Sequence, residues 1–88
     1  MTVRSVVIGV GHYLPERVVP NSEFEKTLDT NDEWIRARSG IERRHFAAEG
    51  ETTSMMAAHA SRSALAHAGL EASDVDAIIV ATSTADLT

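Results

Sequence analysis

Two apolar runs constrain the fold more than any other feature of the sequence. Residues 3–10 read VRSVVIGV and residues 76–82 read DAIIVAT, and both are rich in β-branched apolar side chains. A strand with one wet face would alternate apolar and polar residues, so these runs predict strands that are covered on both faces. Such strands need helices above and below them, and a chain of 88 residues has little material for that.

Two short helices are predicted between these strands. Residues 20–28 (PNSEFEKTL) favour one helix, with Asn21 or Ser22 as its N-cap and with Ser22 and Glu25 spaced as a capping box. Thr30 and Glu33 have the spacing of a capping box for a second helix, which should end before Gly40.

A longer helix is predicted over residues 53–68, ending at Gly69. One side of it should pack, and this side carries Met56, Ala57, Ala60, Ala64, Leu65 and Ala68. The opposite side carries His59, Arg62, Ser63 and His67, which we expect to be solvated. Residues 41–47 alternate loosely and predict a short edge strand.

The order of strand, helices and strand is the opening βαβ unit of a parallel α/β sheet. One good packing helix and two short helices are too few to cover two strands that are apolar on both faces. We therefore expect residues 1–88 to be the N-terminal fragment of a larger domain.

Composition excludes several classes of function. The net charge is −5, which argues against wholesale nucleic-acid binding. The absence of cysteine excludes a disulfide, a thiolate metal site and a thiol nucleophile within these residues. With no apolar run of membrane-spanning length and no signal-peptide pattern, we expect a cytoplasmic protein. The basic residues are nevertheless unevenly distributed along the sequence, since four of the eight lie close together: Arg36, Arg38, Arg43 and Arg44.

Two other patterns resemble sites only superficially. Residues 9–14 (GVGHYL) contain G-x-G, but Leu14 stands where a dinucleotide fingerprint needs its third glycine, which favours a tight turn at the strand end. The four histidines lack metal-ligand spacing, so no metal site is expected. The hydroxyls of residues 82–84 either lie near a substrate pocket or cap the next helix.

Trp34 and Arg38 form the most suggestive pair in the sequence. They are four residues apart, so on a helix they share one face. An indole offers a flat surface to a purine, and a guanidinium can bind phosphate with two parallel hydrogen bonds. The alternative is structural, with Trp34 in the core and Arg38 stacked on its edge. Residues 43–45 could likewise extend a positive rim toward an acidic partner, although a solvated charge run is the simpler interpretation.

Four segments resemble the start of β-ketoacyl-acyl carrier protein synthase III, a thiolase-fold condensing enzyme. They are VIGVGHYLPERVVPN, DTNDEWIRARSGIERRHFA, ETTSMMAAHASRSALAHAGL and DAIIVATST, in this order. The most specific part is DEWI followed by R-x-G-I and R-H-x-A. The resemblance implies a thiolase-like, layered α/β/α/β/α fold, of which this chain holds only the N-terminal βαβ part.

The resemblance also implies a function, which is the initiation of fatty-acid biosynthesis. Such enzymes transfer an acyl group from acyl-CoA to a cysteine and condense it with malonyl-acyl carrier protein, releasing CO2. The nucleophile and its partners lie beyond the matching stretch, so no catalytic residue is assigned here. Carried over by position, Trp34 stacks on the CoA adenine, Arg38 contacts the phosphate-bearing portion, and Thr30 is a polar neighbour of the nucleotide.

The same resemblance implies a homodimer whose partners are acyl-CoA and malonyl-acyl carrier protein. It implies no cofactor, since the CoA thioester is a substrate, and no nucleic acid or membrane partner. Two rivals remain. One is another thiolase-fold CoA enzyme, such as a hydroxymethylglutaryl-CoA synthase or a polyketide starter synthase, and the other is a non-catalytic binding fragment.

Overall fold

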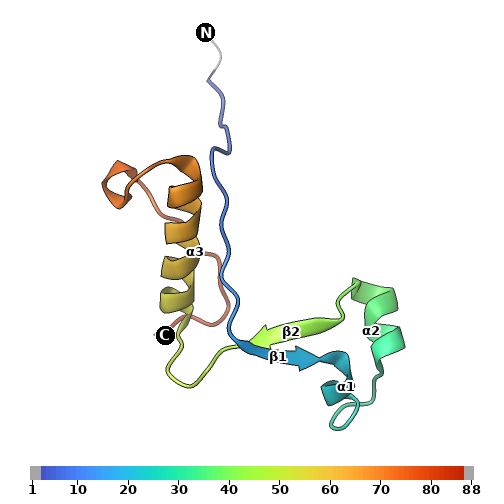
Figure 1. Ribbon diagram of the computed structural model, residues 1–88. Coiled ribbons are helices and arrows are strands. Elements are labelled where there is room, and N and C mark those ends of the chain that lie inside the picture. Colours follow the sequence, from blue (N-terminus) through green and yellow to red (C-terminus); the bar gives the residue numbers. More distant parts are fainter. Residues whose placement is uncertain (1–2, 87–88) are drawn as a thin grey trace. The chain divides into compact units, whose positions relative to one another are not determined.

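The computed structural model describes residues 3–86 as two compact units (Figure 1). One unit is Leu14–Gly50, and the other combines Met1–Tyr13 with Glu51–Thr88. The elements in chain order are β1 (Arg17–Pro20), α1 (Asn21–Phe24), α2 (Asp32–Ser39), β2 (Arg43–Phe46), α3 (Thr53–Ala68) and a short 3₁₀ helix, η1 (Ala72–Asp74).

The unit Leu14–Gly50 contains a two-stranded antiparallel sheet. Strand β1 pairs with β2 in a register that places Arg17 opposite Phe46 and Pro20 opposite Arg43. The edge strand predicted over residues 41–47 is therefore confirmed. Its partner β1 was not predicted, because RVVP carries no alternation long enough to indicate a strand.

Asn21 joins the short elements of this unit and is not a helix cap. Its side chain is 0 % exposed, and its amide nitrogen donates to Asp32 Oδ1 at 2.9 Å and to the carbonyl oxygen of Ile41 at 2.7 Å. Pro20 takes the N-cap position of α1, which has no side-chain cap. The prediction of a cap at Asn21 or Ser22 is thus wrong, because the Asn21 amide is used to bind distant residues instead.

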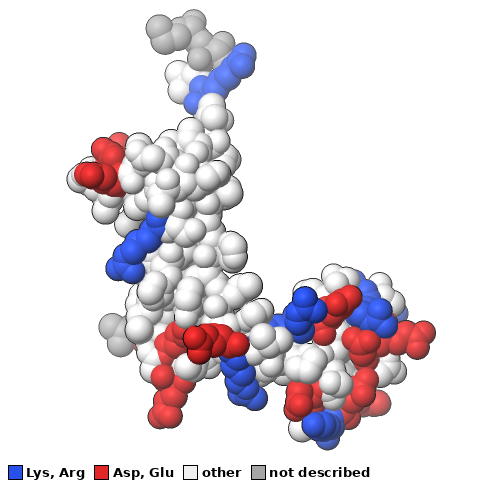
Figure 2. All heavy atoms as spheres, viewed as in Figure 1, with Lys and Arg blue, Asp and Glu red and all other residues white. Residues whose placement is uncertain are grey.

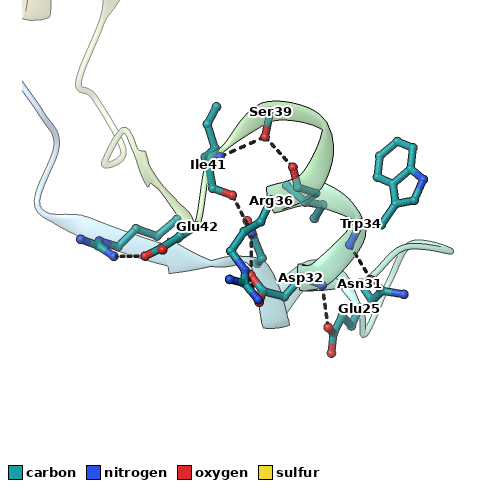
Figure 3. A network of polar contacts seen from close by, with 11 residues as sticks. Glu25, Asn31, Asp32, Trp34, Arg36, Ser39, Ile41 and Glu42 are labelled. Carbon is teal, nitrogen blue, oxygen red and sulfur yellow. Dashed lines mark hydrogen bonds and ion pairs between the residues drawn. The ribbon is translucent and has the colours of Figure 1, made fainter.

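Helix α2 is confirmed, with its cap one residue later than predicted. The side chain of Asn31, not Thr30, accepts a hydrogen bond from the backbone nitrogen of Trp34 at 2.8 Å (Figure 3). The helix ends at Gly40, whose φ of 73° lies in the left-handed region that glycine adopts without strain. Ile35 is buried, so the opposite side of α2 is left to solvent.

Helix α3 is also confirmed, with the predicted bounds. The Thr52 side chain accepts from the backbone nitrogen of Met55, and Gly69 ends the helix with a φ of 72°. The predicted packing face is half-buried and the opposite face is exposed. No residue of α3 is fully buried, so this face is only partly covered by the described residues.

The extended segment formed by residues 3–13 lies along α3 (Figure 1). A Cβ atom on Gly9 would lie 2.7 Å from the carbonyl oxygen of Ala64, and one on Gly11 would lie 2.4 Å from the Ala64 nitrogen. Neither glycine has a positive φ. The predicted tight turn is therefore wrong, and the G-x-G pattern instead permits close approach to the helix backbone.

The two histidines on the outer side of α3 contact the same extended segment. The His59 ring stacks on Tyr13 with a centroid separation of 4.9 Å, and His67 Nδ1 accepts from the Val10 backbone nitrogen at 3.0 Å. Both were expected to be merely solvated. They are exposed, yet each has a partner that the helix pattern could not reveal.

The two predicted buried strands are not strands in the described structure. Residues 3–10 and 76–82 pair with no neighbour, and the sheet of the described residues is β1–β2. Their apolar side chains are exposed, with Val7 at 81 % and Ile79 at 94 %. The physical reason is that a strand is held by hydrogen bonds to a neighbour, and residues 3–86 provide none for either segment.

Candidate functional site

A hollow of about 600 Å³ lies within the unit Leu14–Gly50. Its walls come from the end of α1, the loop before α2, the first turn of α2 and strand β2. The lining residues are Phe24, Leu28, Asp29, Thr30, Asn31, Trp34, Ile35 and Arg44. The hollow therefore combines apolar walls with a few polar groups, as small-molecule sites do.

Trp34 presents its ring to this hollow instead of filling a core. It is 55 % exposed, and its indole points away from the polar network around Asp32 and Asn31 (Figure 3). The backbone of the residue is held by the Asn31 cap. A flat apolar ring is thus available at the wall of a hollow, on a helix whose start is fixed by a side-chain hydrogen bond.

Arg38 lies beside Trp34, as the spacing predicted. Its guanidinium carbon is 5.3 Å from the centroid of the indole ring, a cation–π contact. Arg38 does not line the hollow. The contact leaves one side of the indole covered by a cation, while the ring still forms part of the wall.

Thr30 contributes a polar atom that lacks a partner. Its hydroxyl oxygen is buried and makes no hydrogen bond among the described residues. An unsatisfied buried hydroxyl costs about 1–3 kcal/mol. Thr30 and Trp34 therefore lie on the same hollow, whereas Arg38 lies next to it.

The cluster of four arginines divides into two kinds. Arg36 pairs with Asp32 at 2.8 Å and Arg43 pairs with Glu42 at 3.3 Å. Arg38 and Arg44 form no ion pair within residues 3–86, and each guanidinium lies over an aromatic ring. Figure 2 shows that basic and acidic side chains alternate over this unit, so the net patch is weaker than the sequence suggested.

The match to known proteins extends over the whole chain. It is 85 % identical over 88 residues to the β-ketoacyl-[acyl-carrier-protein] synthase III of Roseobacter denitrificans, and 74 % identical to that of Ruegeria pomeroyi. Over its whole length the chain is thus similar to a part of these synthase III proteins. It spans about 27 % of the length of these relatives. No protein-family model matches the chain.

Solved structures of synthase III relatives share the fold. The 3-oxoacyl-[acyl-carrier-protein] synthase III from Aquifex aeolicus matches 72 % of this chain with a TM-score of 0.62 and 49 % identity. The priming β-ketosynthase from the R1128 polyketide pathway matches 80 % with a TM-score of 0.70 and 44 % identity. These matches cover 20 % and 21 % of the respective structures. They confirm the thiolase-like α/β class, of which this chain is one part.

Of residues 82–84, Thr84 contacts the start of the preceding helix α3, whereas the Thr82 hydroxyl contacts Thr84. The Thr53 hydroxyl donates to the carbonyl oxygen of Thr84, and the Asp86 carboxylate accepts from the Ser54 backbone nitrogen at 3.0 Å and from the Ser54 hydroxyl. Hydrogen bonds from Ser54 lower the pKa of Asp86. This cluster caps the preceding helix, a contact that depends on residues about thirty positions apart and has no local signal.

The described part of the chain holds no group of three His, Cys, Asp or Glu side chains placed to bind a metal ion. It also holds no helix of the length and apolar character needed to cross a membrane. The hollow beside Trp34 is therefore the site on which a functional proposal can rest.

Proposed function

We propose that these residues are the N-terminal part of a β-ketoacyl-acyl carrier protein synthase III and help to hold the CoA portion of its acyl-CoA primer. The complete enzyme would transfer the primer acyl group to a cysteine and condense it with malonyl-acyl carrier protein, giving 3-oxoacyl-acyl carrier protein and CO2. Identity of 85 % over the whole chain supports the assignment. The 88 residues contain no cysteine, so they cannot carry the acyl group themselves.

The observation that carries the CoA proposal is the half-exposed Trp34 ring on the wall of a hollow. Stacking of a base on an aromatic side chain contributes roughly 1–3 kcal/mol. Thr30 lines the same hollow as a polar neighbour of the base, and Arg38, one helical turn from Trp34, offers a positive charge to the phosphates. Trp34, Arg38 and Thr30 thus form the proposed nucleotide end of the CoA site.

Several properties of the whole enzyme are part of the same proposal. We propose that it acts as a cytoplasmic homodimer, with acyl-CoA and malonyl-acyl carrier protein as its partners. It needs no separate cofactor, because the thioester bond of CoA supplies the activated acyl group.

The test uses the full-length synthase that contains this chain. Trp34→Ala should weaken CoA binding about tenfold to hundredfold in calorimetry, since 1.4 kcal/mol corresponds to a factor of ten. Acyl transfer from N-acetylcysteamine thioesters, which lack the nucleotide, should change little. Trp34→Phe, which keeps a smaller aromatic surface, should bind CoA with an affinity between those of the unchanged enzyme and Trp34→Ala. Equal loss with both kinds of donor would contradict a nucleotide platform.

A polyketide starter synthase is the second candidate, because the R1128 priming ketosynthase gives a TM-score of 0.70 over 80 % of the chain. Such an enzyme would use the same CoA end but a different acyl carrier protein. Competing malonyl-loaded carrier proteins from fatty-acid and polyketide systems in one assay would separate the two functions. Preference for the fatty-acid carrier supports the first proposal.

A further inference from the structure

Arg44 is the cation that lines the hollow, and its spacing from Trp34 in the sequence gives no sign that the two residues meet there. It lies on β2, ten residues after Trp34, and lines the hollow together with Trp34 and Thr30. Among the lining residues it carries the single positive charge. Arg38, the cation that the spacing suggested, contacts the indole but does not line the hollow.

The Arg44 side chain is both held and free to bind. Its guanidinium carbon is 5.5 Å from the centroid of the Phe24 ring, which restricts the side chain to one wall. Stacking uses the flat face of a guanidinium and leaves the N–H groups at its edges available. Arg44 forms no ion pair with an acid within residues 3–86, whereas its neighbour Arg43 is paired with Glu42.

The hollow also has one acidic residue. Asp29 also lines the wall, and it forms no ion pair with Arg44. A carboxylate accepts hydrogen bonds from amino groups, such as that of adenine, and repels phosphate. A ligand with an amino-substituted ring at one end and a phosphate at the other therefore fits both charges, provided that the phosphate faces Arg44.

Building on the proposed function, we propose that Arg44 binds a phosphate group of the CoA nucleotide whose base stacks on Trp34. The contact would be a charge-assisted pair of hydrogen bonds from the planar guanidinium. It adds to the site a residue from β2, so that the antiparallel pair β1–β2 positions one end of the nucleotide and α2 the other.

The test measures binding to the full-length synthase with two probes, adenosine 3′,5′-bisphosphate and adenosine, each competing with labelled CoA. Arg44→Ala should weaken the bisphosphate about tenfold and adenosine by less than about twofold, because adenosine lacks the phosphates. The loss should shrink as salt rises. Arg44→Lys should restore part of the affinity, because it keeps the charge but not the planar fork.

Arg43→Ala is the matched control, since it removes an adjacent arginine that does not line the hollow, and it should leave both probes unchanged. Unchanged bisphosphate affinity in Arg44→Ala, or an equal loss for both probes, overturns the Arg44 proposal. If Trp34→Ala weakens both probes while Arg44→Ala weakens neither, only the Arg44 proposal fails. If Trp34→Ala also leaves both unchanged, the proposed nucleotide site itself fails.

Discussion

The two units of the chain differ in how much of their structure they complete by themselves. In Leu14–Gly50, the buried residues include Val19, Ile35 and Asn21, and the Asn21 side chain connects α1 with Asp32 of α2 and with Ile41. In residues 3–13 and 51–86, none of the described residues is fully buried. One unit thus contains a small core of its own, while every described residue of the other is exposed or only half-buried.

Each unit also contains a hollow, and the two hollows differ in their lining. The hollow beside Trp34 is enclosed by local elements and a helix cap, all within Leu14–Gly50. The other unit has a larger, mostly apolar hollow of about 810 Å³, between α3 and residues 72–86. Exposed apolar surface on this scale marks an interface with further polypeptide. Polar residues make up four of the eight that line the hollow beside Trp34, against six of the sixteen that line the other.

The largest expected effect comes from producing the 88 residues alone. This piece should show no condensation of acyl-CoA with malonyl-acyl carrier protein, and its exposed apolar segments should bind the dye ANS and promote aggregation. Fluorescence with ANS and size-exclusion chromatography check the second point. A monodisperse monomer with a sharp, reversible thermal transition would show that residues 3–13 and 51–86 need no cover.

Gly11→Ala in the full-length enzyme should give the next largest effect. The new Cβ would lie 2.4 Å from the Ala64 backbone nitrogen, and helix backbone cannot yield as a side chain can. Overpacking of this kind costs about 1–3 kcal/mol, and we expect about 3 kcal/mol by chemical denaturation. Gly40→Ala is the control, because Gly40 has open space around it and should lose only about 1 kcal/mol through its positive φ.

Asn21→Ala should destabilise the other unit by a smaller amount, about 2 kcal/mol. The substitution removes two hydrogen bonds and leaves the carbonyl oxygen of Ile41 without its donor. Ser22→Ala, on the exposed neighbour, should change the unfolding free energy by less than about 0.5 kcal/mol. Similar losses for the two variants would mean that Asn21 does not hold this unit together.

The smallest effect concerns pH and Asp86. Hydrogen bonds from Ser54 lower the Asp86 pKa below its usual 3.8. A lowered pKa in the folded state stabilises the fold above the unfolded value, and that contribution is lost as the pH falls through the folded value. Carbon-detected NMR of the Asp86 carboxyl should therefore show a midpoint below 3.8, and Ser54→Ala should raise it. A midpoint at or above 3.8 would contradict the hydrogen bonds from Ser54 to the Asp86 carboxylate.

Local features could be predicted from the sequence, and features that join distant segments could not. Helix α3 has its cap, periodic face and terminal glycine within one stretch, and the contact between Trp34 and Arg38 follows from helical spacing. The Asn21 side chain was misassigned because its partners lie 11 and 20 residues away. Arg44 was left out of the site for the same reason, since only the folded position of β2 brings it to the hollow.

The apolar runs teach a related lesson. Their composition predicts strands covered on both faces, yet in the described structure the apolar side chains of residues 3–10 and 76–82 are exposed and no strand forms. Periodicity reports the environment that a segment needs, while strand formation also depends on a hydrogen-bonded neighbour. A piece of a fold can therefore keep the pattern of a strand without the strand.

The central claim is that Trp34 forms the platform for the CoA nucleotide, and fluorine NMR tests it most directly. The full-length synthase would be labelled with 5-fluorotryptophan, and the Trp34 signal assigned as the one lost in Trp34→Phe. Titration with CoA and with adenosine 3′,5′-bisphosphate should shift this signal saturably, whereas pantetheine, which lacks the nucleotide, should not. A Trp34 signal that is unmoved by saturating CoA, or that moves equally with pantetheine, would contradict the account.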